Sequence, residues 1–226
     1  MIQQHVNSIL EKMSRLGISP APVISPEALQ AIAASLSITL PPTYVAFLTQ
    51  IQNGGASDEL HKNGPYYGIY SIEKSLAENE EWEVNVANHS PLISDIHFSD
   101  CYQAEADWDT HVWRYENDSA YKERVETVLD RFQHTGMLDG TLPVCEYGDG
   151  DYFRIMITGN NPGQIWVDSG VISDTGYYCL NVDILTFFER WLDRQLLAKQ
   201  DPSQQLVRAW YPFLEFGSNE RYQLLD

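Results

Sequence analysis

The sequence predicts an α+β protein in which helices pack on one mostly antiparallel β-sheet, with a helical or irregular insert between the two halves. Three observations carry this prediction. Apolar residues recur at helical spacing through the first 51 residues, and four short apolar segments separated by turn residues lie between residues 142 and 180. A strongly amphipathic segment then follows them. Strands that follow one another this closely pair most simply as antiparallel neighbours.

Three N-terminal segments show the pattern of amphipathic helices. The first covers residues 1–16 and ends at Gly17, a residue type that suits helix ends. The second begins at 25–26, where serine and proline supply an N-cap and a first-turn proline. The third follows the prolines 41–42, and residues 53–55 (NGG) can adopt the left-handed backbone that ends it. Its expected buried stripe is Tyr44, Phe47, Leu48 and Ile51.

The middle of the chain is less regular. A strand is predicted at 65–72 (PYYGIYSI), after which apolar periodicity is lost from 75 to 118. A helix is then predicted from Ser119 to near Gly136. Its apolar face comprises Val125, Val128, Leu129 and Phe132.

The C-terminal part supplies most of the predicted sheet. The four predicted strands are 142–147, 151–157, 163–168 and 175–180. They favour an antiparallel meander, which a helix with the sequence DILTFFERWLDRQLL closes. We expect a single domain over 1–198 with an acidic insert at about 75–139, followed by a C-terminal appendage at 199–226.

Charge is distributed unevenly along the chain. The 14 basic and 32 acidic residues give a net charge of −18. Residues 78–118 contain 11 acidic residues and one base, Arg114, so this segment alone has a net charge of −10. Binding to nucleic acid depends on Lys and Arg neutralising phosphates, so the chain is not expected to bind it. A basic protein partner is expected instead.

The N-terminal residues lack the features of a secretory signal. Glu11 and Lys12 stand where such a signal would be apolar, and no apolar run approaches the ~20 residues of a membrane-spanning helix. We therefore expect a soluble, cytoplasmic protein with no membrane partner. The three cysteines, Cys101, Cys145 and Cys179, are widely spaced and are expected to be reduced thiols.

The stretch EYGDGDYF, residues 146–153, has the composition of a metal or phosphate site. A phosphate loop leads into a helix, however, and this one leads into the apolar segment DYFRIMI. A calcium loop needs further oxygen ligands between two helices. The stretch is therefore interpreted as a hairpin turn, in which Asp149 has only a local role.

Other candidate chemistry is equally incomplete. His97 and His111 lie in an acidic segment but lack the spacing that places two metal ligands on one helix face. Glu81 and Glu83 flank a tryptophan as in some glycosidase clefts, yet nothing distinguishes an acid from a base between them. No GxSxG motif is present. We expect no catalytic residue, no metal and no cofactor.

An ordered set of short motifs resembles the SUKH superfamily, which joins fungal cell-wall synthesis regulators to bacterial immunity proteins. The set comprises Leu40-Pro41 with Tyr44, Phe47, Leu48 and Asn53-Gly54-Gly55, then Gly68-Ile69-Tyr70, Leu142-Pro143-Val144, Gly150-Asp151, Gly163-Gln164-Ile165-Trp166, and Phe187-Phe188. It covers about 25–74 and 140–198. The span 75–139 between the two matched parts is longer than in a minimal member.

The resemblance implies a non-enzymatic protein that binds and neutralises a toxin, often a nuclease. The motif residues are then expected to be scaffold. A cell-wall regulator or a signalling scaffold is an alternative, and a hydrolase using carboxylates of 78–118 is a third. The resemblance does not define the oligomeric state.

A basic toxin domain would be bound through the acidic and aromatic residues of the insert. The expected partner-binding residues are Glu80, Glu81, Trp82, Glu83, Asp107, Trp108, Asp109 and Trp113. The acids would speed encounter and the tryptophans would anchor the complex. The alternative is that these tryptophans form the core of the insert, with the acids as its solvated rim.

Overall fold

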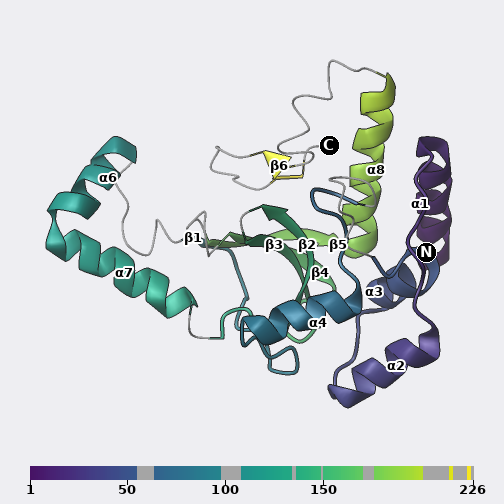
Figure 1. Ribbon diagram of the computed structural model, residues 1–226, viewed down its shortest axis with the longest axis horizontal. Helices are drawn as coiled ribbons and strands as arrows, with labels where there is room; N and C mark the ends of the chain where they lie inside the picture. The colour runs from purple at the N-terminus through teal and green to yellow at the C-terminus, as the bar shows by residue number, and fades with distance from the viewer. Residues whose placement is uncertain are drawn as a thin grey trace.

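The computed structural model confirms the α+β class. It describes residues 1–54, 64–97, 108–133, 136–148, 150–169, 176–200, 214–215 and 223–224. The main sheet is antiparallel and has five strands in the order β1-β5-β4-β3-β2 (Figure 1). Its strands are β1 (Ile96–His97), β2 (Thr141–Gly148), β3 (Asp151–Met156), β4 (Gln164–Ser169) and β5 (Gly176–Asp183). The strands β6 (Leu214–Glu215) and β7 (Gln223–Leu224) pair separately.

The stretch 146–153 lies across the β2–β3 hairpin, so its interpretation as a turn is confirmed. Gly148 pairs with Asp151 at the end of the ladder. Gly148 and Gly150 have φ angles of 144° and 85°, which glycine adopts without steric cost. Asp149 lies outside the described residues.

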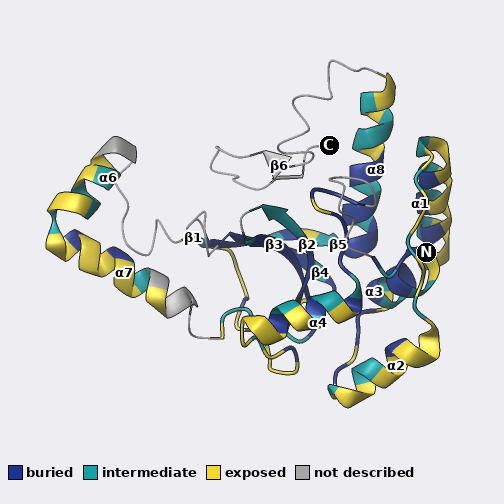
Figure 2. Cartoon of the chain, viewed as in Figure 1, coloured by how far each residue is buried: buried dark blue, intermediate teal, exposed yellow. Residues whose placement is uncertain are grey.

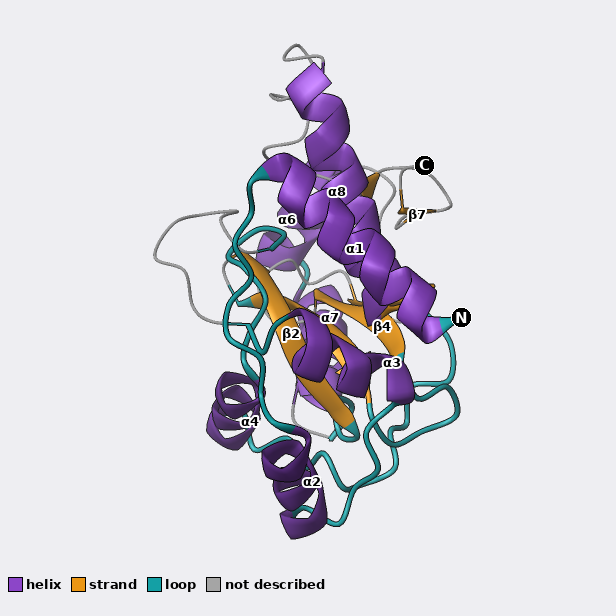
Figure 3. Ribbon diagram, turned by 90° about the vertical axis from the view of Figure 1, so that its right-hand side faces the viewer, coloured by secondary structure: helices purple, strands orange, loops and turns teal. Residues whose placement is uncertain are grey.

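One face of the sheet packs against the predicted helices. These are α1 (Ile2–Leu16), α3 (Pro42–Ala46) with the π-helical turn η1 (Phe47–Ile51), and α8 (Ile184–Gln200). Figures 1 and 3 show α1 and α8 side by side beside the sheet. The main apolar core lies here and includes Phe153 and Ile155 of β3 (Figure 2). Side chains alternate along a strand, so Tyr152 and Arg154 belong to the other face.

Polar contacts also join α1 to α8. Glu189 accepts a hydrogen bond from Ser8, forms an ion pair with Lys12 and lies 2.5 Å from His5 Nε2. Lys12 also reaches Asp193, 2.6 Å away. The predicted helix at 25–26 is α2 (Pro26–Ser35), and the Ser25 side chain accepts a hydrogen bond from the Ala28 N–H as expected of an N-cap.

The predicted end of the third helix is also confirmed. Gly54 has a φ of 60°, and a Cβ at this position would lie 2.4 Å from the carbonyl carbon of Tyr70. The left-handed backbone and the close approach both require glycine here. Gly54 therefore fixes how the segment before α4 (Ile72–Glu81) crosses the end of η1.

The predicted strand at 65–72 is wrong. Tyr66 and Gly68 have φ angles of 52° and 90°, which interrupt an extended backbone, and Ile72 already begins α4. The segment still runs beside β2, because Tyr70 N–H donates to the Val144 carbonyl at 2.9 Å. It therefore covers the outer edge of β2 without being a regular strand.

Two further helices belong to the insert. They are α6 (Trp108–Asn117) and α7 (Ser119–Gln133), and α7 begins at the predicted residue. Figure 1 shows both helices extending away from the sheet on the side of β1. Tyr121 of α7 is buried and lies beneath the guanidinium groups of Arg114 and Arg124. In the described part of the insert, the regular elements are thus helices, together with the short strand β1.

Candidate functional site

A buried polar network holds α4 against the second face of the sheet. The Arg154 guanidinium donates from Nε to Thr141 Oγ1 at 2.8 Å and from Nη2 to Asn79 Oδ1 at 2.5 Å. Asn79 in turn donates to the Thr141 carbonyl at 2.7 Å, and Ser75 donates to the Pro143 carbonyl at 2.6 Å. Hydrogen bonds to β2 and β3 thus fix the position of α4.

A carboxylate on the same face of the sheet neutralises the charge of Arg154. Its Nη1 lies 3.6 Å from Asp168 Oδ2 on β4, and both residues are 2% exposed. Burial lowers the pKa of Arg154, and the nearby Asp168 carboxylate opposes this change. Arginine keeps its proton in such sites, so the network contains a buried ion pair.

The C-terminal end of α4 presents acidic residues to solvent. Glu80, Glu81 and Glu83 are all exposed, and the last turn contains no base. The end of a helix carries partial negative charge, so carboxylates there are electrostatically unfavourable. These acids therefore do not stabilise α4, and a reason for their position must be sought elsewhere.

Glu83 also has an unfavourable backbone conformation. Its φ is 55°, which is in the left-handed region. The residue with this conformation after a helix is usually glycine or asparagine. The Val84 N–H donates to the Asn79 carbonyl at 2.8 Å, which closes the helix end around Glu83. A glutamate at this position is therefore unfavourable for two reasons: its backbone is left-handed, and its negative charge lies at the negative end of the helix dipole.

We expect Glu83→Gly to raise the free energy of unfolding by about 1 kcal/mol relative to Glu83→Ala. Glycine relieves the left-handed strain, whereas alanine removes the charge and keeps the Cβ. Urea unfolding of the two variants and the wild type measures the difference. Equal stability of the glycine and alanine variants would contradict the backbone argument.

Trp82 lies between these acids and is 48% exposed. Its side chain lies beside the hydroxyl of Tyr152 and opposes the rise in the pKa of that phenol, which donates to Glu78 Oε2 at 3.1 Å. Burial and then the Glu78 charge raise the pKa of Tyr152, so this phenol stays protonated and can donate. Contacts to the sheet thus position the exposed indole.

A second phenol–carboxylate pair adjoins the first. Tyr70 packs edge-on against Tyr152, with ring centroids 6.4 Å apart, and donates to Glu146 Oε2 at 3.1 Å. Lys74 Nζ lies 3.8 Å from the centroid of the Tyr70 ring. Burial and then the charge of Glu146 raise the pKa of Tyr70. Glu146, from the stretch first considered as a metal site, is therefore a hydrogen-bond acceptor at the sheet surface.

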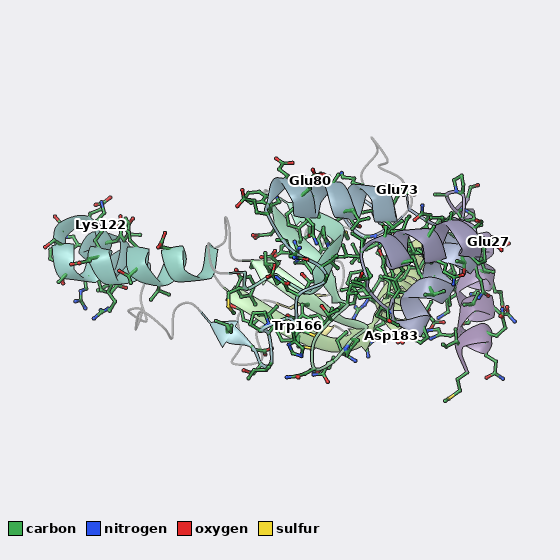
Figure 4. The ribbon with its side chains drawn as sticks, turned by 90° about the horizontal axis from the view of Figure 1, so that it is seen from below. Glu27, Glu73, Glu80, Lys122, Trp166 and Asp183 are labelled. Carbon is green, nitrogen blue, oxygen red and sulfur yellow. The ribbon has the colours of Figure 1, made fainter. Side chains whose placement is uncertain are left out.

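The predicted partner-binding residues fall into two groups. Residues 80–83 come together at the end of α4. Trp113 lies on α6 and is 62% exposed. Figures 1 and 4 show α4 and the α6–α7 pair apart from each other. Asp107 and the side chains of Trp108 and Asp109 lie outside the described part of the structure.

The alternative that the tryptophans form the core of the insert is wrong for Trp82 and Trp113, because both are largely exposed. The residues that position Trp82, namely Asn79, Tyr152 and Arg154, were not predicted from the sequence. One available signal was the single arginine within the apolar strand DYFRIMI. A charge in a buried strand requires a partner, and here that partner lies on another strand.

The described residues contain no group of three or more His, Cys, Asp or Glu that could hold a metal. Asp95, two residues before His97 in the acidic segment, accepts a hydrogen bond from the Cys179 N–H of β5 at 2.8 Å. Cys145 and Cys179 are free thiols, and Cys101 lies outside the described ranges. Within those ranges, no helix has both the length and the apolar character needed to cross a membrane.

The fold and surface therefore define an α+β protein that presents an acidic helix end with an exposed, positioned tryptophan. The chain belongs to the SMI1 / KNR4 family (SUKH-1), which matches residues 23–194. This finding confirms the resemblance to the SUKH superfamily. No curated protein and no solved structure matches the chain significantly. Membership supports a non-catalytic role of the regulator or immunity type.

Proposed function

We propose that this protein is a cytoplasmic immunity protein that binds and neutralises a basic toxin domain. Its proposed binding residues are Glu80, Glu81, Trp82, Glu83, Asp107, Trp108, Asp109 and Trp113. The observation that carries the proposal is the exposed Trp82 among acids that do not stabilise α4. Membership of the SMI1 / KNR4 family supports a role of this kind.

Electrostatics favours a nuclease as the toxin. An enzyme that acts on nucleic acid contacts phosphates through Lys and Arg, so its binding surface is basic. A protein with a net charge of −18 attracts such a surface and would compete with its substrate. The net −10 of residues 78–118 concentrates this attraction on the insert.

The proposed domain boundaries follow the same division. We propose one domain over 1–198, an acidic insert at about 75–139 that supplies the partner surface, and an appendage at 199–226. The burial of Val6, Ile9 and Met13 in the main core supports including α1 in the domain. The exposed residues Trp82 and Trp113 both lie in the insert.

The direct test uses a secreted protein with a basic C-terminal domain encoded beside this chain. Co-expression should protect cells from that domain, and the two purified proteins should form a complex that blocks the toxin's activity. A toxin domain that stays fully active at saturating concentrations of this protein would contradict neutralisation.

Charge reversal tests where the partner binds. We expect Glu80→Lys with Glu81→Lys to slow association with the toxin domain by ~10-fold at low salt, because local steering is lost. The difference should fade as salt rises and shortens the Debye length. Stopped-flow binding across a salt series gives both rates.

The matched control is Glu11→Lys with Glu27→Lys, which changes the net charge equally. Both control residues are exposed and lie on α1 and α2. Figure 4 shows Glu27 and Glu80 well separated on the protein. Equal slowing by the two double variants would show that net charge, and not the α4 surface, drives encounter.

A further inference from the structure

The proposed function leaves open which group of the partner contacts Trp82. Three features of the surface restrict the answer. The residue is 48% exposed, its neighbours Glu80, Glu81 and Glu83 are exposed acids, and α4 has no base in its last turn. An exposed aromatic ring with carboxylates beside it in the sequence attracts a cation.

Among the described residues, cations of α4 and of the α6–α7 pair lie over tyrosine rings. Lys74, on the first half of the helix, lies over the Tyr70 ring and 4.0 Å from Glu78. Arg114, Lys122 and Arg124 lie over tyrosine rings of the α6–α7 pair. None of these described cations lies over Trp82, so we expect a cation that stacks on it to come from a partner.

We propose that Trp82 binds an arginine side chain of a basic protein partner, with Tyr152 as the residue that positions the indole. The inference rests on the proposed function for the existence of that partner. Arginine is the better fit than lysine because its planar guanidinium stacks on an indole. The same guanidinium donates two parallel hydrogen bonds to a carboxylate such as Glu81 or Glu83.

The positioning role follows from the contacts of Tyr152. This residue is 7% exposed, donates to Glu78 and packs against Tyr70, so its hydroxyl has a fixed location on the sheet. The Trp82 side chain lies beside that hydroxyl, where it opposes the rise in the pKa of Tyr152, and the backbone N–H of Trp82 donates to the backbone carbonyl of Glu78 at 3.1 Å. An aromatic residue held in this way loses little rotational freedom when a partner binds.

The test titrates nona-arginine and nona-lysine peptides into the full chain carrying ¹⁵N-labelled tryptophan. The indole resonance of Trp82, assigned with Trp82→Leu, should shift more with nona-arginine than with nona-lysine. Trp82→Leu should weaken nona-arginine binding about two- to fivefold, as expected for an exposed cation–π contact. The matched variant Tyr67→Leu removes an aromatic side chain that is 47% exposed and lies outside the proposed binding residues, and it should leave the affinity unchanged.

Tyr152→Phe tests positioning separately. It should shift the Trp82 indole resonance without peptide and weaken nona-arginine binding. Tyr70→Phe, which removes the neighbouring buried hydroxyl, should leave both unchanged. Equal losses in Trp82→Leu and Tyr67→Leu, or equal Trp82 shifts with the two peptides, would overturn the arginine site. A wild-type resonance and affinity in Tyr152→Phe would overturn the positioning role.

The outcomes separate this inference from the proposed function. A toxin domain that binds wild type and Trp82→Leu equally well contradicts the arginine site and leaves the immunity role standing. Selective nona-arginine binding at Trp82 by a protein that does not neutralise a basic toxin supports the site and contradicts the immunity role.

Discussion

Replacing Arg154 with alanine is expected to lower the free energy of unfolding by about 3–5 kcal/mol. The change removes the guanidinium that faces the buried Asp168 carboxylate, and that carboxylate cannot reach water without a structural change. It also removes the donors that bind Thr141 and Asn79. Urea unfolding monitored by circular dichroism measures the loss.

A double variant shows whether the cost comes from the charge. Arg154→Met with Asp168→Leu removes both members of the pair and fills most of the space. We expect it to be more stable than Arg154→Met alone, because an isolated buried charge costs more than an apolar pair. A single variant within about 1 kcal/mol of wild type would contradict the assignment of a buried ion pair.

This network also explains why α4 was not predictable from the sequence. The buried positions of the helix include Ile72, Ser75 and Asn79, and two of these three residues are polar. Apolar periodicity cannot reveal a helix that is held by hydrogen bonds to a neighbouring strand. The binding partners, Thr141 and Pro143, lie more than 60 residues further along the chain.

The helices of the main core were predictable because their signals are local. The apolar stripe of α1, the Ser25 N-cap of α2 and the apolar face of α8 each lie within a few turns of sequence. The conformation of the segment 65–72 was not predictable. Its alternating aromatic and aliphatic residues are typical of a strand, but Tyr66 adopts a left-handed backbone. Few non-glycine residues do so, and no sequence signal marks this one.

The residues of the candidate site were predictable from the sequence, but their positions relative to one another were not. Counting charges identified residues 80–83 and 113 as parts of one acidic and aromatic segment. Their separation in space depends on where α6 and α7 extend from the sheet, which short-range patterns do not determine (Figure 1). The contact between Trp82 and Tyr152 joins α4 to β3 and depends on the buried network beneath them.

Phe47 tests whether the family's motif residues are scaffold. Its side chain is fully buried and meets Phe188 of α8 edge-on, with ring centroids 5.2 Å apart. We expect Phe47→Ala to lower the free energy of unfolding by about 3–5 kcal/mol, since it removes apolar burial and leaves a cavity between η1 and α8. That loss is a large part of the stability of an ordinary domain. Denaturant unfolding measures it.

Measuring toxin binding by the folded fraction of each variant shows whether Phe47 is a structural residue or a binding residue. We expect Phe47→Leu, which keeps much of the volume, to be destabilised less than Phe47→Ala. Both variants should bind a toxin domain with wild-type affinity per folded molecule, because η1 lies on the sheet face opposite α4. Wild-type stability of Phe47→Ala would contradict its place in the core. A folded Phe47→Leu protein that fails to bind would place the partner surface on the helical face of the sheet, where α1 and α8 lie.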